Sequence, residues 1–156
     1  MFFYICLLKS TALYGCISLI FYRLIKQIPV SELISIALRP TNVQETFIAY
    51  IVWSVPAYII LFAIHSILVV INHKRYPKQI QERFDPLIKS MGSWIISDIT
   101  NPFRGLMAFF TLKNCYDRNL IDCKGWALID VWGTTIIHFL WSVLLFGWII
   151  FGFIKT

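Results

Sequence analysis

Two histidines inside apolar stretches are the residues of this sequence with the clearest capacity for chemistry. His65 lies in AIHSILVVIN and His138 in TTIIHFLWSV. Ionisable side chains at membrane depth are rare and usually functional. Two neutral imidazoles on different helices can act as the axial ligands of a b-type haem. His65 and His138 are therefore candidate cofactor-binding residues for haem b.

Polar side chains also recur at helical spacing along three apolar segments, so that each line of them lies on one side of a helix. In chain order the lines are Thr11, Tyr14, Ser18 and Tyr22; Ser54, Tyr58, His65 and Asn72; and Asp130, Thr134, His138 and Ser142. Helices in a membrane turn such side chains toward one another and away from lipid. We expect these lines to form the polar interior of a helical bundle, either as interhelical hydrogen bonds or as the wall of a binding site.

Other patterns with catalytic or metal-binding chemistry are not found in the sequence, which has no HExxH, nucleophile elbow or glycine-rich phosphate loop. Asp130 and His138 are separated by about 12 Å of helix rise, too far for a catalytic pair. Cys115 and Cys123 do not have a zinc-site spacing, and they form a disulfide only if their loop faces an oxidising compartment. We expect no metal ion and no enzymatic activity.

The composition indicates that lipid covers much of the chain. Hydrophobic residues make up 58% of the 156 residues and charged residues 14%, with a mean hydropathy of +0.72. A soluble domain usually has about 45–50% hydrophobic and about 25% charged residues. The net charge of +6 does not indicate nucleic-acid binding, because the basic residues flank apolar segments and do not form one patch. We predict an all-α integral membrane protein with a single membrane domain over residues 1–156.

Three segments are long and apolar enough to cross about 30 Å of hydrocarbon: residues 2–25, 48–72 and 130–154. The first contains Lys9, whose side chain we expect to extend along the helix to the headgroups. Lys155 lies just beyond the end of the third segment, at the far membrane surface.

Residues 85–112 are harder to place. Their apolar side chains recur at helical spacing, but Asp98 and Arg104 make a membrane crossing costly. We therefore expect a cytoplasmic-side pair of amphipathic helices, broken at Asn101-Pro102. The alternative is that this segment is a fourth transmembrane helix.

The distribution of basic residues favours the three-span arrangement with the N-terminus inside, because most of the 14 basic residues then lie on the cytoplasmic side. A basic cluster after the second span is expected at anionic headgroups; it consists of Lys74, Arg75, Lys78 and Arg83. Three spans also place His65 and His138 about 7 Å and about 6 Å from the membrane midplane, both on the cytoplasmic side. Four spans would instead place His138 on the opposite side of the midplane from His65.

These patterns predict a small polytopic protein of a bacterial inner (plasma) membrane, surrounded by the lipid bilayer. We expect it to act non-catalytically through helix–helix contacts with another integral membrane protein, as a complex subunit or as an immunity- or inhibitor-type protein. The alternative is a membrane anchor subunit that binds b-type haem between His65 and His138 for electron transfer. The sequence leaves the partner and the oligomeric state open.

Overall fold

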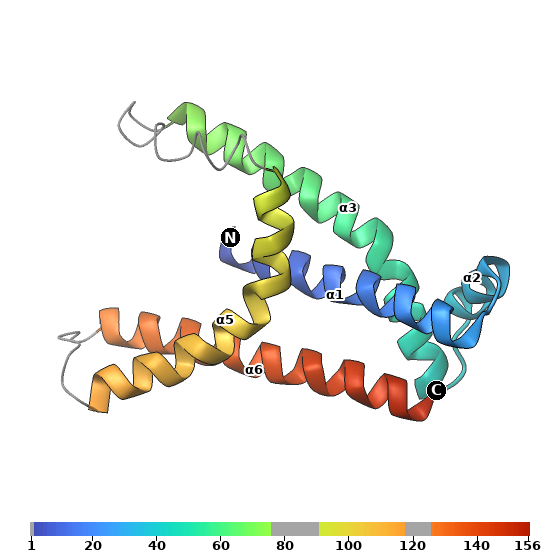
Figure 1. Ribbon diagram of the computed structural model, residues 1–156. Coiled ribbons are helices and arrows are strands. Elements are labelled where there is room, and N and C mark those ends of the chain that lie inside the picture. The colour runs from blue at the N-terminus through green and yellow to red at the C-terminus, as the bar shows by residue number, and fades with distance from the viewer. Residues whose placement is uncertain (1, 76–90, 118–125) are drawn as a thin grey trace. The chain divides into compact units, whose positions relative to one another are not determined.

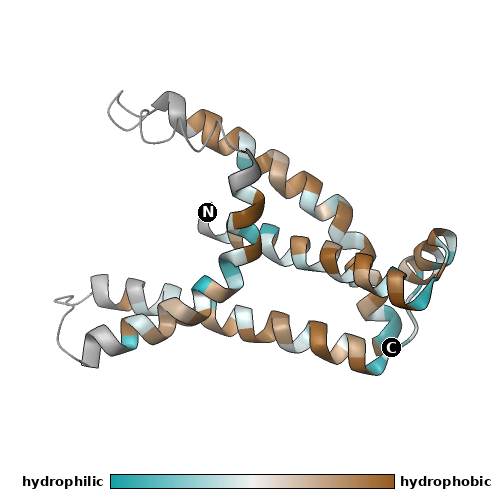
Figure 2. Cartoon of the chain, viewed as in Figure 1, coloured by the Kyte–Doolittle hydropathy of each residue, from teal (hydrophilic) through white to brown (hydrophobic). Residues whose placement is uncertain are grey.

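The computed structural model describes residues 2–75, 91–117 and 126–156 (Figure 1). Within these residues the chain forms five helices: α1 (Phe2–Lys26), α2 (Val30–Leu38), α3 (Val43–Arg75), α5 (Met91–Asp117) and α6 (Trp126–Lys155). Three of them are long and apolar enough to cross a membrane, over Tyr4–Lys26, Val43–Ile71 and Trp132–Lys155. Figure 2 shows α3 and α6 coloured as apolar along most of their length. The predictions of an all-helical chain and of three long apolar helices are confirmed.

The helices belong to two compact units, which are described separately. Unit 1 contains the described residues up to Ile99 together with Gly152–Thr156, and unit 2 contains Thr100–Phe151. One boundary falls within α5 and the other near the end of α6. Unit 1 therefore holds α1, α2, α3, the first part of α5 and the last turn of the chain.

In unit 1, α1 and α3 approach closely where Gly15 faces Ser54. A Cβ atom on Gly15 would lie 2.5 Å from the Cβ of Ser54, so only glycine allows this separation of the two backbones. One turn away, the Tyr50 hydroxyl donates to the Thr11 carbonyl at 2.9 Å. The small residue and the hydrogen bond together fix the register of α1 against α3.

α3 begins at Val43, earlier than the expected residue 48, because its first turn is well capped. The Asn42 side chain accepts a hydrogen bond from the Glu45 N–H at 2.8 Å. The Glu45 carboxylate in turn accepts from the Thr41 N–H at 2.6 Å. This reciprocal capping lets a polar sequence form the start of an otherwise apolar helix.

α2 is a short helix that the sequence pattern did not predict. It buries Leu33 and Ala37 on α3, and the Trp53 indole N–H donates to the Ala37 carbonyl at 3.2 Å. Its end at Leu38 precedes Pro40, which disfavours helical geometry in the residue before it. Its buried residues, Leu33 and Ala37, are spaced four apart, an amphipathic signal that the sequence-based prediction did not use.

α5 corrects the expected pair of helices, because Met91–Asp117 is one helix with Pro102 inside it. A proline has no N–H to donate to the carbonyl four residues earlier, which here belongs to Asp98. The Ser10 hydroxyl of α1 donates to that carbonyl instead, at 2.6 Å. The helix therefore continues through Pro102, because Ser10 of α1 supplies the hydrogen bond that the Asp98 carbonyl would otherwise lack. The expected start at residue 85 lies outside the described residues.

The last residues of the chain pack at the end of unit 1 where α1 ends and α3 begins. Gly152 lies directly against the Phe47 ring, and the rings of Phe47 and Phe153 are 5.7 Å apart. The Lys26 ammonium donates to the Thr156 carbonyl at 2.6 Å. The C-terminus of α6 thus lies next to the C-terminus of α1.

In unit 2, the later part of α5 runs antiparallel to α6. Phe103 pairs with Phe146 at 5.2 Å between ring centroids, and Phe109 stacks on Phe139 at 4.3 Å. Between these ring pairs, a Cβ on Gly105 would lie 3.0 Å from His138 Nδ1. Glycine is therefore what allows α5 to pack closely over His138.

Candidate functional site: a buried charged cluster

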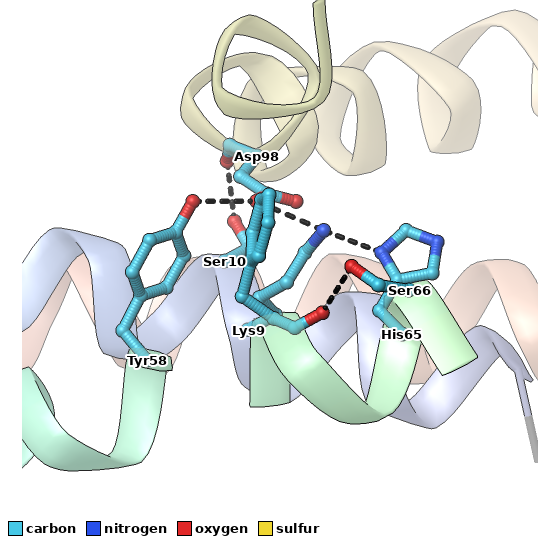
Figure 3. Close-up of polar contacts among 7 residues, drawn as sticks. Lys9, Ser10, Tyr58, His65, Ser66 and Asp98 are labelled. Atoms are coloured by element: carbon cyan, nitrogen blue, oxygen red, sulfur yellow. Dashed lines mark hydrogen bonds and ion pairs between the residues drawn. The ribbon is translucent and has the colours of Figure 1, made fainter. Parts of the chain in front are cut away.

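A group of polar side chains is buried in unit 1 among α1, α3 and α5 (Figure 3). We call it the Lys9 cluster and define it by Lys9, Ser10, Tyr58, His65 and Asp98. Lys9 is 1% exposed, Asp98 4% and His65 8%. Residues of these types are almost never buried to this degree without a partner, so their contacts decide what the cluster can do.

Lys9 lies at the centre of the cluster, and its charge is neutralised there. Its Nζ is 3.2 Å from Asp98 Oδ2 and 2.5 Å from His65 Nδ1. The same atom lies 5.3 Å from the centre of the Phe62 ring and 5.5 Å from that of Trp94, close enough for cation–π attraction. The expectation that Lys9 extends to the headgroups is wrong, because an anion, an imidazole and two rings surround it.

Asp98 connects α5 to both other helices. Its Oδ2 also accepts a hydrogen bond from the Tyr58 hydroxyl of α3, at 3.1 Å. The Lys9 ammonium and the Tyr58 hydroxyl both face this carboxylate. The ammonium of Lys9 is thus the principal group that favours the ionised carboxylate in this apolar setting.

His65 is held in one tautomer by its neighbour. Because the Lys9 ammonium donates to Nδ1, the ring proton of a neutral His65 lies on Nε2. The ring stacks on Trp94, with 4.7 Å between centroids. A haem iron binds a ring nitrogen through its lone pair, and neither nitrogen offers one in this arrangement. His65 therefore fits a haem poorly.

Two hydroxyls of α1 hold the backbone of α5. Ser10 donates to the Asp98 carbonyl, and the Tyr14 hydroxyl donates to the Ile99 carbonyl at 2.7 Å. The first of these carbonyls is the one left without a helical donor by Pro102. The Asp98 side chain and the backbone carbonyls of Asp98 and Ile99 thus contact the same part of α1.

The three predicted polar lines have different environments. In the first line Ser18 and Tyr22 are buried, whereas the Thr11 hydroxyl donates to the Leu7 carbonyl of its own helix. In the second line Ser54 is buried at the contact with Gly15. In unit 2 the buried Ser142 hydroxyl donates to the His138 carbonyl, and Thr134 is exposed. Among the described side chains of these lines, Tyr58 and His65 belong to the Lys9 cluster, and Tyr14 donates to the backbone of α5 beside it.

Some predicted residues lie outside what the structure describes. These are the side chains of Asn72, Lys74, Arg75, Cys115 and Asp130, and the whole of Lys78, Arg83 and Cys123. The predicted basic cluster, and the pairing of Cys115 with Cys123, therefore remain predictions. Within the described ranges, no three side chains among His, Cys, Asp and Glu converge as a metal site would require.

Sequence reasoning missed Lys9, Ser10 and Asp98 as members of a site. A signal was present, because one cation and one anion each stood in an apolar segment where a single charge is costly. Considering the two as a pair would have predicted the contact between α1 and α5. Ser10 offered no such signal, since it lies outside the polar line predicted for its helix.

The cluster can hold three helices together in a charge-balanced arrangement. With Lys9 and Asp98 ionised and His65 neutral, its net charge is zero, which suits an apolar environment. No family model matches the chain, and no curated protein or solved structure matches it either.

Proposed function

We propose that this chain is an integral membrane protein that acts without catalysis, by binding another integral membrane protein through helix–helix contacts. Its spans are α1, α3 and α6, and we assign it to a bacterial inner membrane with the N-terminus inside. The small size and simple architecture support that location. The Lys9 cluster supports a non-catalytic role, because its charged groups are used in joining helices.

The observation that carries the proposal is an apolar groove along the seam between α1 and α3, with a volume of about 460 Å³. Small side chains form much of it, which lets another helix approach closely. The lining residues are Leu8, Thr11, Ala12, Thr46, Ala49, Tyr50, Trp53, Ser54, Ala57 and Leu61. A transmembrane helix of the partner protein is the occupant that we assign to this groove.

The hydroxyl groups that line the groove are turned to backbone carbonyls of the protein. Thr46 donates to the Asn42 carbonyl at 2.8 Å, and Ser54 donates to the Ile51 carbonyl at 2.8 Å. Tyr50 and Thr11 likewise donate to carbonyls. The groove therefore presents an apolar wall, which favours an apolar helix over a polar ligand.

A photoreactive amino acid at Ala57 tests this contact, with Ile59 as the matched control. Ala57 lines the groove, whereas Ile59 is 64% exposed and lies on the opposite side of α3 at nearly the same depth. We expect irradiation of intact cells to give one adduct of defined mass at Ala57 and none at Ile59. Equal adducts at both positions, or none at either, would contradict the proposed contact.

The haem alternative is tested by a reduced-minus-oxidised spectrum of the protein purified in detergent from a haem-producing host. Because Lys9 uses Nδ1 of His65, we expect a colourless protein. A haem band lost on either His65→Ala or His138→Ala would instead establish the membrane anchor as the function.

A further inference from the structure

The first part of α5 does not have the surface of a helix lying at the membrane–water interface. Such a helix turns its charged side to water and its apolar side to lipid. Here the charged side chain, Asp98, faces α1 and α3 and is 4% exposed. The outward side is formed by Ile95, Ile96 and Ile99, which are 43%, 63% and 38% exposed. This face requires an apolar covering.

The contacts of this segment define its depth relative to α1 and α3. The midpoints of the two apolar spans are Gly15 and Ala57. Lys9 lies about 9 Å from the first midpoint and His65 about 12 Å from the second, toward the same end of unit 1. Both are within the ~15 Å half-thickness of the hydrocarbon core. Asp98 and Trp94, which contact them, lie at the same level.

We propose that residues 91–99 are a half-helix embedded in the bilayer, with lipid acyl chains covering Ile95, Ile96 and Ile99 and the Lys9–Asp98 ion pair holding it there. This inference rests on the proposed membrane insertion of α1 and α3. These nine residues account for about 14 Å of helix rise, so by themselves they reach only part of the way through the hydrocarbon core. This position in the hydrocarbon core differs from the interfacial helix pair expected from the sequence.

The ion pair explains how an aspartate is tolerated at this depth. An unpaired carboxylate or ammonium in hydrocarbon is costly, and each of these two offsets part of that cost for the other. The hydrogen bonds from Tyr58 to the carboxylate and from Ser10 to the Asp98 carbonyl satisfy further polar groups on the same side of α5. The most exposed side chains of residues 94–99 are then Ile95, Ile96 and Ile99, and these face lipid.

Cysteine accessibility tests the proposal in a variant that lacks the four native cysteines. Single cysteines replace Ile96 on the half-helix, Ile60 near the middle of α3 and Glu32 on α2. A charged maleimide is applied to membranes opened on both sides, and labelling rates are compared with those in denaturant. We expect Glu32→Cys to react at least about tenfold faster than Ile60→Cys and Ile96→Cys, because thiols in hydrocarbon do not meet the reagent.

The same experiment separates failure of this inference from failure of the proposed insertion. If Ile96→Cys reacts as fast as Glu32→Cys while Ile60→Cys stays protected, α3 is inserted and the half-helix is not. If Ile60→Cys reacts as fast as Glu32→Cys, insertion of α3 itself is wrong and the half-helix proposal is overturned with it.

A second set of variants tests the ion pair. Adding Lys9→Met to Ile96→Cys should raise the labelling rate several-fold, because the unpaired Asp98 carboxylate then favours water. Adding Asp98→Leu to that variant should restore protection. Ile60→Cys with Lys9→Met serves as the control for folding and should stay protected. Unchanged labelling of Ile96→Cys with Lys9→Met would show that the ion pair does not hold the segment.

Discussion

At the level of single residues, Lys9 is the side chain whose replacement should change stability most. Its ammonium pairs with Asp98 and His65 where almost no water reaches it. Removing one member of a buried ion pair costs about 3–5 kcal/mol, because the other charge remains buried. We predict this loss for Lys9→Met, measured by reversible unfolding in mixed micelles.

The matched control is the double variant Lys9→Met with Asp98→Leu, which removes both charges. Replacing a buried pair by apolar residues is often neutral or stabilising. We expect the free energy of unfolding of the double variant to return to within about 1 kcal/mol of the native value. Additive losses from the two substitutions would mean that the charges do not act as a pair.

At the level of elements, Ser10 and Pro102 should be energetically coupled. Ser10→Ala removes the donor to the Asp98 carbonyl, and Pro102 leaves that carbonyl without a helical partner. We predict that Ser10→Ala costs about 1–2 kcal/mol in the native chain and distinctly less in a Pro102→Ala background, where residue 102 has an N–H. A double-mutant cycle of unfolding free energies measures the coupling. Equal costs in both backgrounds would contradict this account of α5.

The contact between α1 and α3 depends on the absence of a side chain at position 15. In Gly15→Ala the new Cβ would overlap the Ser54 side chain, so the helices must separate. Overpacking of this kind costs about 1–3 kcal/mol. We predict that loss of unfolding free energy for Gly15→Ala and a change within about 0.5 kcal/mol for Gly147→Ala, because a Cβ at Gly147 meets nothing within 4 Å.

At the level of the whole molecule, the long apolar helices could be predicted from the sequence because composition alone decides them. The Lys9 cluster was predictable only in its charged pair, Lys9 and Asp98, because the contacts of Ser10, Tyr58 and His65 depend on how the helices pack. The continuous α5 was missed for a related reason, because the donor that compensates for Pro102 is Ser10 of a distant helix. α2 was missed because a nine-residue helix forms only when packing stabilises it, here on α3, although its buried residues Leu33 and Ala37 do recur at helical spacing.

The end of the chain gives the last prediction, which concerns its topology in the membrane. The Lys26 ammonium contacts the Thr156 carbonyl, and Phe153 packs on Phe47. In a three-span protein the C-terminus and α2 lie on the same side of the membrane, whereas a fourth span would place them on opposite sides. We therefore predict that Glu32→Cys and a cysteine appended after Thr156 react equally with an impermeant maleimide in intact cells.

A cysteine-free chain supplies the background for that measurement, and each single-cysteine variant is also labelled in opened membranes. If both cysteines react in intact cells, α1 and α6 cross the membrane in the same direction, with the N-terminus inside. If both react only in opened membranes, the shared side is confirmed and the orientation that we infer from the basic residues is reversed. Labelling of one cysteine in intact cells and of the other only in opened membranes would require a further span, and residues 91–117 are then the segment that must provide it.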